Sequence, residues 1–501
     1  MKAITHTLKH TKKHATKIAI ASALSLALTA CGGSSSSSET PAPPAASPMA
    51  KYQGIWLAPS YGKGIDIKNN ELTLFDYTQD FCFVDEEFDD LDADDLAHAF
   101  NLSNDELQLE QKEGYGAGDI YAPGAIFSKE ESMPASCARG FMSQLGDDNF
   151  TLNVEQDLAY FYQTFKEFSV SIELQQVDWE DLYTTAQQKL AAEPTEAVLM
   201  DVLVDMIRPL KDGHTGLGDD LEITFPNKPY FTNLLFNEFL ELNELTQIEN
   251  AFQEQAAIAY IREQYSLMTE IIVDYADNET DITIDDSENL MWFEVDGIGY
   301  LQITGMDGYA DDDDSAEQLA NLDSALDQAL TDLQYTQGLI IDIRRNMGGN
   351  DFISLAIASR FIDQQLFAYQ KQARLGDSRT VLREVHISPR GNVQYLNPIV
   401  LLTSATTLSA AEVFTMTMKN LPQVTLMGEA TQGEFSDVLE KTLPSGLNFG
   451  LSNEYYLTTT GDWLEGQGVP VDIELPTFSK AERLAEVDLI LEAAFNLLSA
   501  Q

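Results

Sequence analysis

The stretch IVLLTSATTLSAAE at residues 399–412 decides the fold of this chain. Its first five residues, 399–403, form an apolar run that predicts a buried strand, and the residues after Ser409 predict a helix. A serine at such a break can present its hydroxyl from the start of a helix, where free backbone N–H groups stabilise a developing oxyanion. Ser409 is therefore a candidate nucleophile.

The same strand–turn–helix pattern occurs upstream, in GLIIDIRRNMGG at residues 338–349 and the helix expected over 351–362. Further strands are expected at 298–303 and 424–427, and a helix at 315–333. This alternation predicts an α/β core with largely parallel strands. Reactive loops gather at the carboxyl ends of such strands, so the glycine turn and Ser409 should share one edge of the sheet.

A base for the serine is available in KDGHT at residues 211–215, which follows a run of helical patterns. A serine hydroxyl needs a neighbouring base, and the pKa of an imidazole suits that role near neutral pH. A nucleophile, a base and a glycine turn are the parts that an acyl-transfer enzyme requires. After residue 30 only His98, His214 and His386 remain, with no helical spacing between any two, so we expect no metal and no cofactor.

Four segments together resemble the tail-specific (C-terminal-processing) serine peptidases and the tricorn core protease. They are LKDGHT at 210–215, DIRRNMGG at 342–349, TSATTLSAAE at 403–412 and EGQGVPVD at 465–472. The resemblance covers about 154–476, although 216–290 matches poorly. It implies a crotonase-like α/β core and a serine endopeptidase acting on a protein or peptide substrate.

The resemblance also implies roles for particular residues. The tail-specific branch uses a lysine base shortly after the nucleophile, but Glu434 stands at that position. The tricorn-like branch takes its base from an upstream histidine, which matches His214, with Ser409 as nucleophile. In that branch a glutamate matching Glu465 holds the histidine together with a serine that directly precedes it. This chain has Gly213 there, which leaves Asp212 and Thr215 as alternative partners of His214.

The expected oxyanion hole consists of the backbone N–H groups of Ala410, Gly348 and Gly349. Retinoid-binding repeats share the same module, so the resemblance allows a second hypothesis about function. Under that hypothesis the chain is a catalytically inactive module that binds a peptide or an apolar ligand. A surface lipoprotein that recruits a partner through its N-terminal domain is a third possibility.

The first thirty residues read as a targeting segment. Five lysines precede an apolar run at 18–30, which is too short to span a bilayer as a mature helix. The tetrad LTAC at 28–31 resembles the lipobox of bacterial lipoproteins and implies lipidation of Cys31; an ordinary secretory signal is the alternative. Gly32 follows where an inner-membrane retention signal would have Asp, so we expect an outer-membrane lipoprotein.

The composition is strongly acidic, with a net charge of −52 from 81 acidic and 29 basic residues. Loss of the five leader lysines leaves 24 basic residues and a charge of −57. Such a surface repels nucleic acid and anionic lipid, so neither is an expected partner. In an oxidising compartment Cys82 and Cys137 are expected to form a disulfide.

The expected organisation follows the changes of pattern along the chain, and the oligomeric state is left open. The segments are a signal peptide at 1–30, a Ser/Pro/Ala-rich tether at 31–50, a β-rich domain at 51–150 with a loop at 85–95, a helical subdomain at 151–215, a helical insertion at 216–290, the catalytic core at 291–478 and a C-terminal helix at 479–501.

Overall fold

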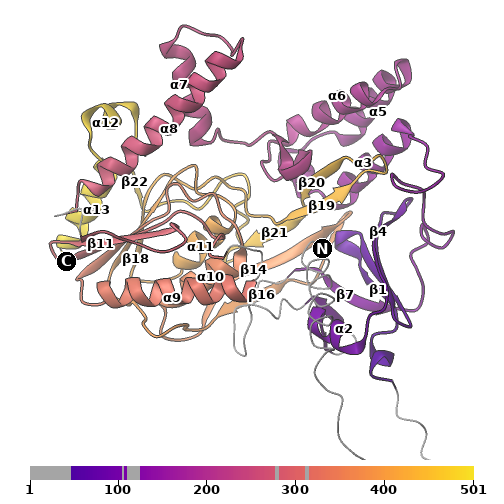
Figure 1. Cartoon of the computed structure of the whole chain (residues 1–501), viewed down its shortest axis with the longest axis horizontal. Coiled ribbons are helices and arrows are strands. Elements are labelled where there is room, and N and C mark those ends of the chain that lie inside the picture. The colour runs from indigo at the N-terminus through magenta and orange to yellow at the C-terminus, as the bar shows by residue number, and fades with distance from the viewer. Residues whose placement is uncertain (1–46, 104–105, 110–123, 277–280, 311–314, 501) are drawn as a thin grey trace, which may run out of the picture. The chain divides into compact units, whose positions relative to one another are not determined.

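The computed structural model describes residues 47–500 except 104–105, 110–123, 277–280 and 311–314 (Figure 1). The predicted signal segment, Cys31 and most of the predicted tether lie outside the described residues. Among the described helices, none combines the length and the apolar character that crossing a membrane would need. The described residues form two compact units, one within residues 47–142 and one within 143–500.

The first unit is a seven-stranded antiparallel sheet in the order β4-β3-β2-β1-β7-β6-β5. Its elements are β1 (Gly54–Ala58), β2 (Lys63–Lys68), β3 (Glu71–Tyr77), β4 (Cys82–Phe88), α2 (Ala93–Ala99), β5 (Phe100–Ser103), β6 (Glu106–Leu109) and β7 (Ile126–Glu130). Inward-facing residues such as Trp56, Ile65 and Leu74 pack with Leu96 of α2. The predicted disulfide between Cys82 and Cys137 is present.

The acidic segment 85–95 is not the loop that its charge predicts. It contains the end of β4 and the start of α2. Asp85 and Glu87 alternate toward solvent along the strand. Asp92 caps α2 by accepting from the N–H groups of Asp94 and Asp95. Acidic residues are compatible with the exposed face of an edge strand and favourable at a helix start, so composition alone was misleading here.

The second unit is built on a seven-stranded sheet in the order β10-β11-β12-β13-β17-β18-β22. Its strands are β10 (Thr283–Ile284), β11 (Leu290–Val295), β12 (Ile298–Ile303), β13 (Gly338–Asp342), β17 (Ile399–Thr403), β18 (Val424–Gly428) and β22 (Ile473–Glu474). The strands from β12 to β22 pair in parallel, and β10 and β11 pair antiparallel. The predicted α/β core of mainly parallel strands is confirmed.

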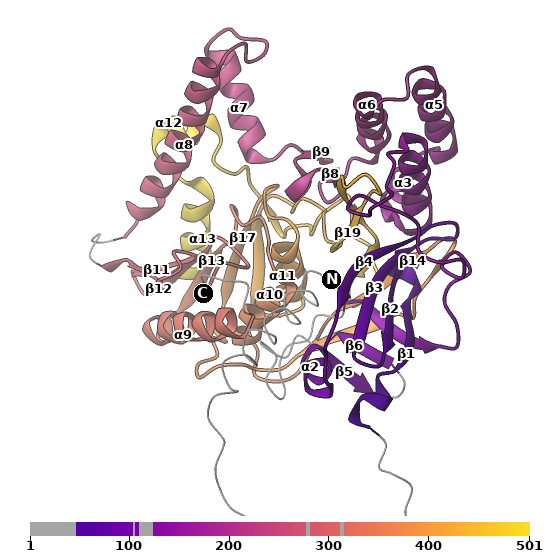
Figure 2. The same cartoon turned by 45° about the vertical axis from the view of Figure 1, so that its right-hand side comes forward.

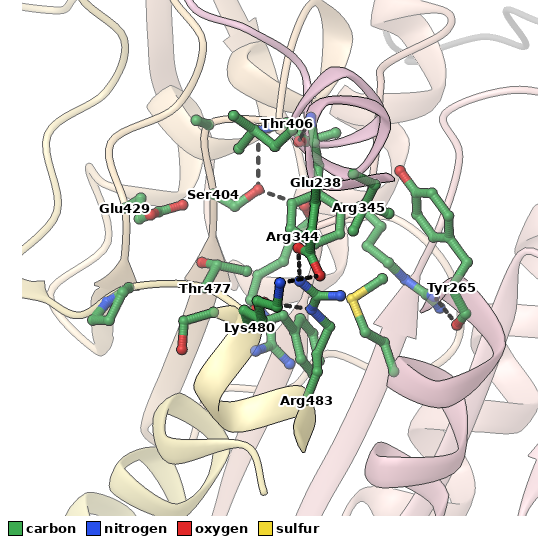
Figure 3. Close-up of a pocket in the computed structure, with 18 of the residues that line it drawn as sticks. Glu238, Tyr265, Arg344, Arg345, Ser404, Thr406, Glu429, Thr477, Lys480 and Arg483 are labelled. Carbon is green, nitrogen blue, oxygen red and sulfur yellow. Dashed lines mark hydrogen bonds and ion pairs between the residues drawn. The ribbon is translucent and has the colours of Figure 1, made fainter. Parts of the chain in front are cut away.

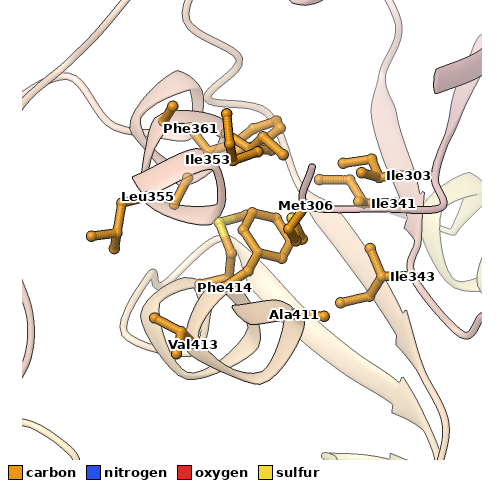
Figure 4. Packing of buried hydrophobic residues seen from close by; sticks show 14 of the residues in the cluster. Ile303, Met306, Ile341, Ile343, Ile353, Leu355, Phe361, Ala411, Val413 and Phe414 are labelled. Atoms are coloured by element: carbon orange, nitrogen blue, oxygen red, sulfur yellow. The ribbon is translucent and has the colours of Figure 1, made fainter. Parts of the chain in front are cut away.

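Helices cover both faces of this sheet because successive residues of its buried strands point to opposite sides. Leu339 and Ile341 pack with α9 (Ser315–Leu333), α10 (Asp351–Ala358) and α11 (Ala410–Met418). Figure 4 shows this cluster, with Phe414 of α11 set between Ile353 of α10 and the strand residues.

The opposite face is covered by two other helices. Ile340 packs there with residues of α8 (Ala251–Val273) and α13 (Leu489–Ser499). The predicted C-terminal helix 479–501 is in fact two helices, α12 (Lys480–Ala485) and α13. The chain breaks at Glu486, whose φ is 54°, and restarts where Asp488 caps α13. The prediction of a single helix is wrong because the apolar spacing continues across that break.

The remaining elements surround the core. In the described part of the second unit, the α-helices that precede His214 are α3 (Val154–Phe168), α4 (Val170–Gln175), α5 (Trp179–Ala192) and α6 (Glu196–Ile207). The insertion forms an antiparallel helix pair, in which α7 (Phe231–Leu242) lies beside α8 (Figure 2). One small sheet contains β14 (Leu366–Leu375), β15 (Ser378–Arg379), β16 (Arg383–Ile387) and β21 (Glu454–Leu457). A second small sheet contains β19 (Val438–Thr442), β20 (Asn448–Ser452), β8 (Gly216–Leu217) and β9 (Ile223–Thr224).

Candidate active site

Ser409 lies between β17 and α11, at the carboxyl edge of the sheet. Its φ of 57° and ψ of −130° place it outside the regions that L-residues favour, at a cost of about 1–3 kcal/mol. Its N–H donates to the carbonyl of Glu434 at 3.0 Å, which helps to hold the turn. The half-buried Ser409 side chain therefore stands on a sharp strand-to-helix turn, as a nucleophilic serine does in hydrolases.

The loop before Ser409 is fastened to the loop that follows β13. The hydroxyl of Ser404 donates to the carbonyl of Arg344 at 2.6 Å, and that of Thr407 donates to the carbonyl of Ile343 at 2.9 Å. The N–H of Leu408 donates to the carbonyl of Asn346. These bonds place the glycine turn against Ser409, on the sheet edge where the sequence predicts it.

The glycine turn touches the serine directly. A Cβ atom on Gly348, whose φ is +95°, would lie 2.6 Å from the Ser409 Cβ. The Gly348 N–H already donates to Asn346 Oδ1 at 2.9 Å. In the described chain, the N–H groups of Gly349 and Ala410 have no acceptor. Two of the three predicted oxyanion donors are thus available, and the third is engaged.

A buried ion pair braces this turn from below. Arg344 is 1% exposed and its guanidinium lies 2.6 Å from Asp342 and 2.7 Å from Asp488 of α13. Burial raises the pKa of Asp342, but the Arg344 guanidinium outweighs it and holds that pKa below its usual value. The first turn of the C-terminal helix is therefore tied to the loop that carries Gly348.

His214 follows the helices α3 to α6, and the strand β8 just after it pairs with β20 of a small sheet. Gly216 and Leu217 of β8 pair with β20, two residues after the histidine. The carboxylate of Asp212 accepts from the His214 N–H at 2.8 Å, from the Thr215 hydroxyl at 2.8 Å and from Ser171. The His214 ring is half-buried, and its Nδ1 is buried without a hydrogen-bond partner.

The carboxylate of Glu465 does not bind the His214 ring. It accepts from the N–H of Phe435 at 3.3 Å and 3.2 Å. Burial, followed by the charges of Asp212 and Glu412, raises the pKa of Glu465 well above its usual value. Asp212 and Thr215, the predicted alternatives, are bonded to backbone and hydroxyl groups and not to the ring.

Glu434 is hydrogen-bonded both to Ser409 and to Gly213, the residue before His214. The Glu434 carbonyl accepts from the Ser409 N–H, and its carboxylate accepts from the N–H of Gly213 at 3.1 Å. Burial raises the pKa of Glu434 above its usual value, and the nearby His214 imidazole offsets only part of that rise. The Ser409 hydroxyl and the His214 ring share no hydrogen bond in this structure. Ser409 and the residue before His214 are therefore both bonded to Glu434, but no hydrogen bond joins the serine hydroxyl to the ring.

Glu412, the glutamate of the serine motif, fixes the loop that carries Glu434. Its buried carboxylate accepts from the N–H groups of Gly433 and Glu434, each at 2.7 Å, and from the Thr431 hydroxyl at 2.5 Å. Burial raises the pKa of Glu412 to about 7, although these donors oppose the shift. The sequence motif contained Glu412, but its bracing role is visible only in three dimensions.

A strap from the insertion, residues 227–231, crosses the same loop. Lys228 Nζ donates to the carbonyls of Thr431 at 2.6 Å and Gln467 at 2.9 Å. The Tyr230 hydroxyl donates to Glu434 Oε2 at 3.0 Å. Sequence reasoning missed Lys228 and Tyr230 because the insertion matches the recognised pattern poorly and gives no local signal of contact with residue 434.

A cavity of about 290 Å³ is lined in part by the loop before Ser409 (Figure 3). Its lining includes Ser404 and Thr406 of that loop, apolar residues of α7 and α8, and the Glu238–Arg483 ion pair. Neither Ser409 nor His214 lines it. In the described ranges, no three His, Cys, Asp or Glu side chains are grouped to hold a metal ion.

Comparison with known proteins finds a family model that matches part of the chain. Residues 297–475 match the model of Peptidase family S41. The chain is 26% identical over 185 residues to the carboxy-terminal processing protease CtpA of Bacillus subtilis, covering 36% of each chain. It is 27% identical over 158 residues to the chloroplastic C-terminal processing peptidase of Tetradesmus obliquus, covering 31% of this chain and 33% of that one. The alignments thus span about a third of these curated relatives.

Solved structures extend the likeness of fold over more of the chain. A candidate peptidase from Parabacteroides merdae is 22% identical, with a TM-score of 0.54, and the match covers 70% of this chain and 97% of that one. Mature CPAF is 16% identical, with a TM-score of 0.50, covering 69% of this chain and 96% of that one. At these identities the likeness concerns the fold alone.

Proposed function

We propose that this chain is a serine-type endopeptidase that hydrolyses peptide bonds through an acyl-enzyme on Ser409; the match of residues 297–475 to the model of Peptidase family S41 supports this. The observation that carries the proposal is the Ser409 turn. A serine held at φ 57° at the start of a helix, beside two N–H groups without acceptors, has the geometry of an acylating nucleophile. The family implies a protein or peptide as substrate.

In the proposed mechanism the Ser409 hydroxyl attacks the scissile carbonyl and its proton passes to His214. The oxyanion of the tetrahedral intermediate accepts from the N–H groups of Ala410 and Gly349. Loss of one such donor typically costs about 3 kcal/mol in the barrier. His214 then returns the proton to the leaving amine, and water releases the acyl group by the reverse sequence. Because catalytic hydrogen bonds often tighten only on substrate binding, the missing Ser409–His214 bond is compatible with this role.

The alternative is a peptidase-fold module that binds a peptide or an apolar ligand without cleaving it. Two observations favour it: the His214 ring lacks a hydrogen bond to Ser409, and the Glu465 carboxylate is hydrogen-bonded to the Phe435 N–H and not to that ring. The strained Ser409 backbone argues for catalysis, because a binding module has no use for that strain.

Hydrolysis of unfolded casein by purified variants separates the two functions. We expect Ser409→Ala and His214→Ala each to lower the rate by at least about 10³-fold. Ser378→Ala, on exposed β15, and His386→Ala, on the exposed face of β16, are the matched controls and should keep the wild-type rate. Wild-type rates in both Ser409→Ala and His214→Ala would overturn the proposal, and a folded wild-type protein with no hydrolysis would favour the binding module.

We also propose that the protein is a cell-envelope lipoprotein anchored through Cys31. The support is the LTAC tetrad and the Ser-rich segment that follows it. Such an anchor would confine the proposed peptidase to substrates at the envelope.

A further inference from the structure

The space beside Gly213 is filled by two groups from other parts of the chain. An ideal Cβ on Gly213 would lie 2.1 Å from the Tyr230 hydroxyl and 2.5 Å from Glu434 Oε2. Real Cβ atoms essentially never approach other atoms so closely. Residue 213 therefore cannot have a side chain while the Glu434 carboxylate and the Tyr230 hydroxyl occupy that position. Gly213 stands where the tricorn-like branch has a serine, and Glu434 stands where the tail-specific branch has a lysine. These two differences belong together, because the Glu434 carboxylate occupies the space beside Gly213.

Glu434 is held on every side. Its Oε1 accepts from the Gly213 N–H at 3.1 Å, and its Oε2 accepts from the Tyr230 hydroxyl at 3.0 Å. Its own N–H donates to Glu412 at 2.7 Å, while its carbonyl accepts from Ser409 at 3.0 Å. The residue is 2% exposed. The Glu434 carboxylate is therefore anchored to the backbone one residue before His214, and the Glu434 backbone is hydrogen-bonded to Ser409.

The charges around His214 single out Glu434. The Asp212 carboxylate accepts from the backbone N–H of His214 and from the hydroxyls of Thr215 and Ser171. The Glu465 carboxylate accepts from the backbone N–H of Phe435. Glu412 binds the 431–434 loop, and Lys228 binds backbone carbonyls. The Glu434 carboxylate, in contrast, is bonded at the N–H of Gly213, the residue next to His214.

We propose that Glu434, held by Tyr230, is the positioning carboxylate of His214: it stabilises the imidazolium that forms when Ser409 attacks, and it replaces Glu465 in that role. The Nδ1 of His214 is buried without a hydrogen-bond partner. If the other ring nitrogen takes the serine proton, Nδ1 is the N–H donor of the imidazolium, and the Glu434 carboxylate, held at the neighbouring Gly213 N–H, is the acceptor that we assign to it. Gly213 is the residue that makes room for this substitution. The inference rests on the proposed function, because it concerns the base of the same reaction.

The direct test is the titration of the His214 ring, observed by NMR of ¹³C-histidine-labelled protein. After residue 30 the chain has three histidines, so His214→Ala assigns the resonance. A neighbouring carboxylate raises the pKa of an imidazole by about 1 unit or more. We expect Glu434→Gln to lower the midpoint of the His214 titration by about 1 pH unit. Glu434→Asp should retain most of the wild-type value, and Glu465→Gln and the exposed control Glu440→Gln should leave it unchanged.

This measurement requires no activity, so its failure is separate from failure of the proposed function. A His214 midpoint unchanged in Glu434→Gln, or lowered in Glu465→Gln instead, would overturn the inference. If casein hydrolysis depends on Ser409, its pH profile gives a second readout. The acidic limb, where His214 becomes protonated, should move to lower pH in Glu434→Gln with a maximal rate reduced on the order of 10²-fold or more.

A reciprocal pair of variants tests the packing on which the inference depends. Gly213→Ser alone should lower the melting temperature and the rate of hydrolysis, because its side chain must displace the Glu434 carboxylate and the Tyr230 hydroxyl. Gly213→Ser combined with Glu434→Ala should recover much of the lost melting temperature, since the second change opens the space that the first one needs. A Gly213→Ser protein as stable and active as the wild type would contradict the arrangement.

Discussion

The strained backbone of Ser409 is held by contacts on three sides. Glu434 accepts its N–H, Gly348 lies against its Cβ, and the loop before it is bonded to the loop after β13. Each holding group is itself fixed, Glu434 by Glu412 and the glycine turn by Asn346. The strain at Ser409 is therefore supported by a connected network, as expected where function requires an unusual conformation.

Glu412 makes the stability of the second unit depend on pH. Burial raises the pKa of its carboxyl to about 7. The folded protein then binds this proton more tightly than the unfolded chain does. The resulting stabilisation is complete below the unfolded pKa and is lost as the pH rises through about 7, and its size is about 3 kcal/mol. In Glu412→Gln this part of the pH dependence should disappear.

Urea unfolding between about pH 5.5 and 8.5 would measure the effect, in a range that avoids the isoelectric point near 4.1. The free energy of unfolding of the wild type should fall with pH more steeply than that of Glu412→Gln, with Glu440→Gln following the wild type. Parallel curves for the wild type and Glu412→Gln would refute the assignment, whatever their vertical offset.

Residue-level prediction from the sequence succeeded where local pattern and position coincide. Ser409 follows an apolar strand and precedes a helix, and both features are written in consecutive residues. The contact of Glu434 with Gly213 joins positions 221 residues apart, and that of Tyr230 with Glu434 joins positions 204 residues apart. A single sequence contains no signal for such pairings. The absence of a side chain at 213 was visible, but the group that fills the space was not.

At the scale of elements, the turn between β13 and α10 depends on glycine. Gly348 and Gly376 both have positive φ, +95° and +55°, but a Cβ on Gly376 would meet nothing within 4 Å. Alanine at either site should cost about 1 kcal/mol of stability from the backbone alone. Gly348→Ala should in addition displace Ser409 and eliminate casein hydrolysis, whereas Gly376→Ala should retain it.

Comparing hydrolysis with the melting temperature in these two variants separates the effects. We expect both variants to lose a similar amount of stability. Only Gly348→Ala should also lose hydrolysis. Full activity in Gly348→Ala would show that the turn does not press on the serine.

Elements with strong internal periodicity were predictable from the sequence. The helix α9 and the strand β12 have the predicted bounds, because an apolar stripe and a continuous buried run are local signals. The break at Glu486 was not predictable, since the apolar spacing continues through it. What ends α12 there is the left-handed backbone at residue 486, followed by the Asp488 cap and its ion pair with Arg344.

At the scale of the whole molecule, the prediction to be tested is that a lipid on Cys31 anchors the protein to a membrane. The predicted anchor lies outside the described residues. Expression in a bacterium fed with labelled palmitate should give a labelled protein that sediments with membranes. Cys31→Ser should be unlabelled and should leave the membrane fraction. Label that persists in Cys31→Ser would contradict the anchor at this residue.

The most direct test of the central claim is the identification of the residue that a fluorophosphonate modifies, by mass spectrometry of the purified protein. We predict a single adduct on Ser409, absent from Ser409→Ala and formed far more slowly in His214→Ala. A folded wild-type protein without an adduct, or an adduct on another serine that forms equally fast in Ser409→Ala, would contradict the account.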